Sequence, residues 1–80
     1  MKYELFSRVA LAEDLPEYKL CRGDVATIVE HHPISDGEDG YSLEVFNATG
    51  ETIAVITVAE SQITPLRSNT ILNTRLLEVA

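Results

Sequence analysis

The chain has 80 residues, of which 45% are hydrophobic and 24% charged, and its formal net charge is −7. This length fits one small domain, and the composition is that of a folded protein, which excludes a disordered acidic tail. The single cysteine, Cys21, excludes an internal disulfide. No apolar run approaches the roughly 18–20 residues that span a bilayer, and no signal peptide begins the chain. We therefore expect a cytoplasmic protein without membrane contact.

The first stretch, residues 3–12, alternates apolar and polar side chains, which is typical of a half-buried strand. A strand over residues 8–12 is favoured, and a short helical turn is the alternative for residues 3–8. Pro16 has no amide hydrogen for a ladder and predicts a loop. Leu20, which follows that loop, is expected to pack back against the core.

Three further strands are predicted downstream. Residues 25–30 are rich in β-branched side chains and read as a strand that is buried on both faces or strongly bent. Residues 41–45 alternate cleanly and indicate a strand with one wet face. Residues 52–58 are almost continuously apolar and predict a central strand. Gly23 and Gly50 are expected to supply positive φ angles in the adjoining turns.

The end of the chain contains one predicted 3₁₀ turn at residues 59–62 and a short strand at residues 63–67, which Pro65 restricts to an edge. Five short strands predict an all-β fold, a small five-stranded SH3-like β-barrel over residues 1–67 that is partly open. Residues 68–80 form an apolar C-terminal extension, the tail. Its spacing fits a helix and a strand equally well, so periodicity leaves its conformation undecided.

An ordered series of short motifs resembles the bacterial domain-of-unknown-function family numbered 4926. The resemblance covers about residues 4–67 and implies a small SH3-like barrel with no established activity. Some members of that family look like partners in toxin–antitoxin-type gene pairs. The chain departs from the family pattern in its tail and in Ala26, where Gly is common. The matching motifs are residues 5–11, 13–16, 22–30, 41–46, 50–58 and 62–66.

Charge disfavours a nucleic-acid partner. There is no Lys or Arg between Gly23 and Leu66, whereas eight Asp and Glu residues lie there, and phosphate binding needs cations. The acidic surface either serves solvation alone or attracts a basic protein. In the loop before the third strand, Asp36, Glu38 and Asp39 are the residues that we expect to steer such a partner.

No residue pattern predicts an active site, a metal site or a cofactor. His31 and His32 are adjacent and should point to opposite faces of a strand, so they are poorly placed to share a metal. The acidic loop lacks the ligand spacing of an EF-hand. Cys21 is not part of a recognisable nucleophile motif. A cluster of His31, Cys21 and a carboxylate in one cleft would reopen the case for an enzyme.

The tail carries the main functional hypothesis. Leu72, Leu76 and Leu77 either pack on the barrel itself or dock on another chain. We predict a non-catalytic protein-interaction module, such as an antitoxin- or immunity-like partner, with these leucines as anchors. The alternative is a structural barrel that self-associates, most simply as a two-fold dimer.

Overall fold

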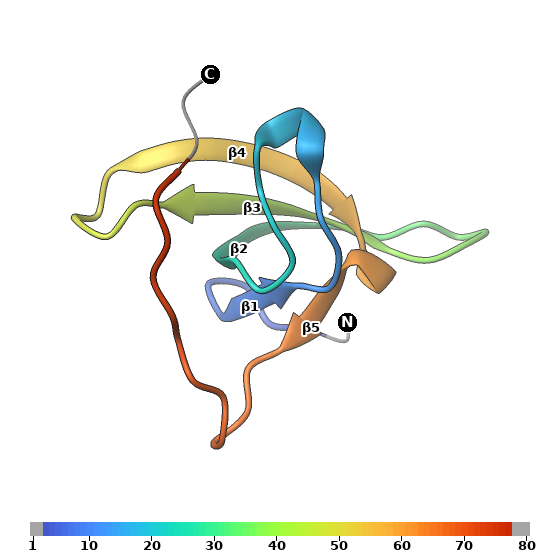
Figure 1. Cartoon of the computed structure of the whole chain (residues 1–80). Helices are drawn as coiled ribbons and strands as arrows, with labels where there is room; N and C mark the ends of the chain where they lie inside the picture. The colour runs from blue at the N-terminus through green and yellow to red at the C-terminus, as the bar shows by residue number, and fades with distance from the viewer. Residues whose placement is uncertain (1–2, 78–80) are drawn as a thin grey trace.

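The fold is all-β, as predicted, and it contains one five-stranded antiparallel sheet. The computed structural model describes residues 3–77. The sheet order is β4-β3-β2-β1-β5, so the last strand returns to pair with the first and the sheet curls around a core (Figure 1). The elements are β1 (Arg8–Leu11), η1 (Pro16–Tyr18), β2 (Val25–His32), β3 (Gly40–Phe46), β4 (Thr52–Ala59), η2 (Glu60–Gln62) and β5 (Ile63–Pro65), where η is a 3₁₀ turn.

The sheet is not closed, because β4 and β5 form its two edges. The prediction of a central strand over residues 52–58 is therefore wrong. Its apolar run consists of two rows that face opposite ways: Ile56 and Val58 are buried in the core, whereas Val55 is 63% exposed. A continuous apolar run can thus belong to an edge strand when only its inward row is buried. The short edge strand predicted at Pro65 is confirmed.

The core lies inside the curl of the sheet. Ile28, Tyr41 and Leu43 have no exposed surface, and the ring of Tyr3 meets that of Tyr41 edge-on at 5.6 Å between centroids. Leu20 is 3% exposed, which confirms that the chain returns to the core after η1. Apolar residues from all five strands complete one continuous cluster.

The N-terminal segment is neither the strand from residue 3 nor the helical turn over residues 3–8. A turn occupies residues 5–6, and β1 begins only at Arg8. Phe6 has a φ of 64°, outside the range of extended backbone, so the chain bends there. The Phe6 N–H donates to Ile28 O at 2.6 Å, which ties the turn to β2.

The turns that rest on glycine agree with prediction. Gly23 has a φ of 93° before β2, and Gly50 has a φ of 88° in the hairpin between β3 and β4. The side chain of Asn47 shapes that hairpin, since its Oδ1 accepts the N–H groups of Thr49 and Glu51 at 3.1 and 2.8 Å. This hairpin sets the register of β3 and β4, and with it the inward row of β4.

The described part of the tail, residues 68–77, has neither helix nor strand. It leaves β5, turns, and runs past the ends of β1, β2 and β3 toward β4 (Figure 1). The two conformations that periodicity left open are thus both replaced by an irregular, extended strap. Its route links the region of one sheet edge with that of the other.

Candidate functional site

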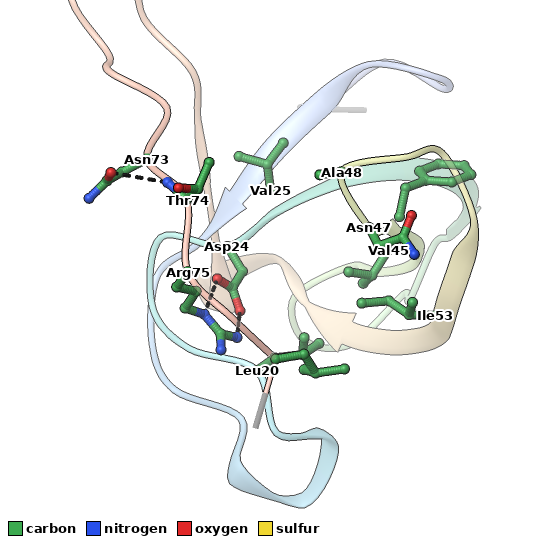
Figure 2. Close-up of a pocket in the computed structure, with 12 residues that line it drawn as sticks. Leu20, Asp24, Val25, Val45, Asn47, Ala48, Ile53, Asn73, Thr74 and Arg75 are labelled. Atoms are coloured by element: carbon green, nitrogen blue, oxygen red, sulfur yellow. Dashed lines mark hydrogen bonds and ion pairs between the residues drawn. The ribbon is translucent and has the colours of Figure 1, made fainter. Parts of the chain in front are cut away.

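The strap and the barrel together line an open hollow of about 240 Å³ (Figure 2). The barrel contributes apolar side chains to it, among them Leu20, Val25 and Ile53, and the strap contributes Arg75 and Leu77. This volume is below the roughly 300 Å³ of a small-molecule pocket. The hollow is therefore better suited to hold part of a polypeptide than a metabolite.

A salt bridge fastens the strap at this hollow. Arg75 Nε donates to Asp24 Oδ1 at 3.0 Å, and Arg75 Nη2 donates to Asp24 Oδ2 at 2.5 Å, so the pair is bidentate. Arg75 Nη2 also donates to the carbonyl oxygen of Lys19 at 3.2 Å. Asp24 lies in the turn before β2, where it accepts the Cys21 N–H at 2.8 Å. Two distant segments are joined at one carboxylate.

Electrostatics supports a permanent charge on both partners. Burial alone would raise the pKa of the Asp24 carboxyl, but the hydrogen bonds from Arg75 and Cys21 outweigh it and lower that pKa below 3.8. The hydrogen bond to Asp24 also raises the pKa of Arg75. Both groups are ionised at neutral pH, so the salt bridge is present under ordinary conditions.

The leucines predicted as anchors differ in their surroundings. Leu76 is 93% exposed and Leu72 is 54% exposed, so these two side chains present apolar surface to solvent. Leu77 is 42% exposed and lines the hollow. Ile71, which sequence reasoning did not single out, is 85% exposed. The strap is fastened by Arg75 while its apolar residues on either side remain accessible.

The acidic residues predicted to steer a partner are partly used inside the fold. Asp39 Oδ2 lies 2.7 Å from His31 Nε2, and Asp39 Oδ1 accepts the Ile34 N–H at 3.2 Å. The hydrogen bond with His31 lowers the pKa of Asp39. Glu38 accepts the N–H of Ser61 at 2.7 Å. Within residues 3–77 only Asp36 of the three has no hydrogen-bond partner, so two of these carboxylates order the loop.

The two groups of residues predicted to contact a partner, the leucines of the strap and the carboxylates of the acidic loop, lie at opposite ends of the molecule. The hollow is lined by Val25, the first residue of β2, and by Phe46, the last residue of β3. The acidic loop joins the other ends of these strands and projects away from the strap (Figure 1). Screening at physiological salt acts over about 8 Å, whereas the molecule is 38 Å long. The loop charges thus have little influence at the strap.

The residues that could have supported catalysis do not meet in one site. Cys21 is exposed and precedes β2, whereas His31 lies near the end of that strand, stacked on Tyr41 at 5.2 Å. His32 Nε2 lies 2.7 Å from Ser42 Oγ, away from the Asp39 partner of His31. Over residues 3–77 no group of three His, Cys, Asp or Glu side chains could hold a metal ion.

The Arg75–Asp24 pair was not predicted. The partners are 51 residues apart in sequence, and a single Arg within an apolar tail does not reveal its acceptor. The available signal was that Asp24 sits in a turn beside the core, where a carboxylate needs a compensating donor.

Fold and site together define a small all-β protein with an open, curled sheet and an apolar C-terminal strap. A family model described as a domain of unknown function, DUF4926, matches residues 5–65, and the chain belongs to that family. The match ends with the last residue of β5, so the strap lies outside it. No curated protein and no solved structure matches the chain. Within residues 3–77 no helix is long and apolar enough to cross a membrane.

Proposed function

We propose that this protein is a non-catalytic protein-interaction module, cytoplasmic, that contacts its partner through the strap. The observation that carries the proposal is a fastened segment with exposed apolar side chains on both sides of its fastening point. Leu72 and Leu76 are 54% and 93% exposed, and Arg75 between them is bound to Asp24. An ordered segment loses less conformational entropy on binding than a free tail would.

The chemistry of this surface favours a polypeptide partner. Exposed aliphatic side chains gain free energy when another apolar surface covers them, roughly 1.5–3 kcal/mol for each one fully buried. The adjoining hollow is small and open to a side chain of the partner. A module that occludes another protein in this way would suit an antitoxin- or immunity-like role.

The acidic loop supports a second, weaker contribution. Of the three loop carboxylates Asp36, Glu38 and Asp39, only Asp36 can meet an outside partner without loss of a hydrogen bond to the described residues 3–77. The chain has a net charge of −7. A basic partner would be attracted over longer distances at low salt. In this proposal the loop changes the rate of association, and the strap provides the contact.

Affinity capture from the native cell, with the whole chain as bait, tests the strap. The double variant Leu72→Asp/Leu76→Asp should lose the captured protein, because it places charge where apolar contact is required. Asn69→Asp is the matched control: it adds a charge to the same exposed segment, outside the hollow, and removes no apolar surface, so capture should persist.

The outcomes separate the alternatives. Equal capture by the double variant and the wild type would overturn the strap as the contact. Asp36→Lys should leave the retained amount unchanged at high salt and slow association only at low salt. A complete loss of capture with Asp36→Lys would move the contact from the strap to the acidic loop.

A further inference from the structure

The two edges of the sheet differ in what they offer to another strand. β5 has three residues and ends in Pro65, whereas β4 has eight residues, none of them charged and none of them proline. Exposed edges are normally protected by short length, proline or charged side chains. The β5 edge has two of these protections, and the β4 edge has none of them.

Backbone hydrogen bonding sharpens the contrast. Ile63 donates its N–H to Glu60 O, and Pro65 has no N–H. The Ala12 N–H donates to Gln62 O. Because backbone hydrogen bonds in an antiparallel ladder involve every second residue, the next residue of β5 that bonds to β1 is Thr64. The backbone groups of Ile63 and Pro65 therefore point away from β1. The outer side of β5 therefore has no donor left for a neighbouring strand.

On β4, by contrast, two backbone N–H donors at the free edge remain open. The Glu60 N–H donates to Asp39 O. Every second residue before it, Val58 and then Ile56, therefore has its backbone N–H directed to β3. The N–H groups of Val55, Thr57 and Ala59 then point to the free edge. Ala59 N–H is bound by Gln62 Oε1 at 2.8 Å. By this alternation the N–H groups of Val55 and Thr57 have no acceptor within residues 3–77.

We propose that β4 binds the β4 strand of a second copy, antiparallel and centred on Ile56. This register places Val55 opposite Thr57 of the other copy and Thr57 opposite Val55. The four open N–H groups of the two chains then all find carbonyl acceptors. The exposed Val55 side chain gains a cross-strand neighbour, and no two like charges meet within the strands, because β4 has no charge.

The assembly must stop at two copies. A two-fold contact uses the same surface on both chains and is closed. Two β5 edges cannot extend it by pairing with each other, since the outer side of β5 offers no N–H donor. Mutual repulsion of two chains, each with a net charge of −7, opposes the contact. The dimer should therefore become stronger as salt screens that repulsion.

Sedimentation equilibrium of the full chain at low and high salt tests the proposal. We expect a monomer–dimer equilibrium whose dimer fraction rises with protein concentration and with salt. Val55→Lys should abolish the dimer, because the side chain is 63% exposed and the charge protects the edge without disturbing the core. Thr64→Lys, the same charge on the exposed face of β5, is the matched control and should dimerise like the wild type.

Two further measurements keep the test decisive. Thr57→Pro removes an edge N–H donor and no backbone bond to β3, and it should also give a monomer. It also removes the contact between Thr57 Oγ1 and Ser42 Oγ at 3.4 Å, so Thr57→Val, which removes that contact but keeps the N–H, is its control and should still dimerise. Amide exchange at Val55 and Thr57 should slow as concentration rises, whereas exchange at Ala59 should not change. A monomer at all concentrations and salts, or assembly beyond two copies, would overturn the proposal.

The strap is the competing interface. Loss of the dimer with Leu76→Asp and its retention with Val55→Lys would assign self-association to the strap and overturn the β4 contact. The β4 proposal does not depend on the strap's outside partner. Capture of that partner by a monomeric Val55→Lys chain would leave the proposed function intact.

Discussion

The barrel and the strap contain the same kinds of apolar residue, and the structure treats them in opposite ways. In the barrel Leu43 is 0% exposed, whereas in the strap Leu76 is 93% exposed. The barrel residues lie on strands whose backbones pair with neighbours on both sides or on one side. The strap has no such pairing, and Arg75 fastens it at one point. Apolar content alone therefore does not indicate burial; the backbone must first bring a residue to the core.

Truncation of one leucine in the barrel and one in the strap should give the largest difference in the free energy of unfolding. Leu43→Ala should lower the free energy of unfolding by about 2–5 kcal/mol, since it removes a fully buried side chain and leaves a cavity. Leu76→Ala should change it by less than about 0.5 kcal/mol, because the side chain is in solvent. Urea denaturation of both variants measures the difference. A large loss with Leu76→Ala would show that the strap packs on the barrel in solution.

The fastening of the strap should have a smaller effect on global stability. Arg75→Ala removes a bidentate ion pair that is partly exposed, and solvent-screened pairs of this kind contribute little to the free energy of unfolding. The local effect should be larger, because the strap loses its attachment. Limited proteolysis should cut residues 68–77 faster in Arg75→Ala than in the wild type. Arg67→Ala is the control, and its strap should be cut at the wild-type rate.

Sequence reasoning predicted most of the fold because local signals and tertiary structure agree there. β-branched residues at residues 25–30 and the alternation at residues 41–45 both became strands, and the Gly23 and Gly50 turns have the expected positive φ angles. The prediction that β4 is a central strand was wrong for a physical reason. An apolar run in the sequence shows only that the side chains are apolar. It does not show whether the strand has one neighbouring strand or two.

The site was harder to predict, because it depends on contacts between distant segments. Asp39 was expected to face a partner, but its carboxylate is hydrogen-bonded to His31 within the fold. Asp24 directly follows the predicted Gly23 turn, and its bond to Arg75 becomes visible only once the strap crosses the barrel. A charged residue in sequence shows that a charge is present, whereas the fold decides whether that charge remains available.

The smallest expected effect is the response of the strap to acid. The pKa of Asp24 is lowered in the folded chain, so its ionised form stabilises the fastened strap above pH 3.8. This stabilisation is lost as pH falls below 3.8 and through the lower pKa of the folded state. The strap should therefore detach in that range while the barrel stays folded. The NMR signal of the Arg75 Nε–H, followed from pH 5 to about pH 2, reports the detachment directly.

Asp24→Asn provides the control for the acid response. An amide cannot titrate, so the Arg75 signal should already be that of a detached strap at pH 5 and should not change on acidification. Asp39 also has a lowered pKa, but it lies at the opposite end of β2 and should not affect the Arg75 signal. An Arg75 signal in the wild type that stays constant over the whole range from pH 5 to about pH 2 would mean that the salt bridge does not hold the strap. The strap would then be held in place, like the strands of the barrel, by contacts other than this salt bridge.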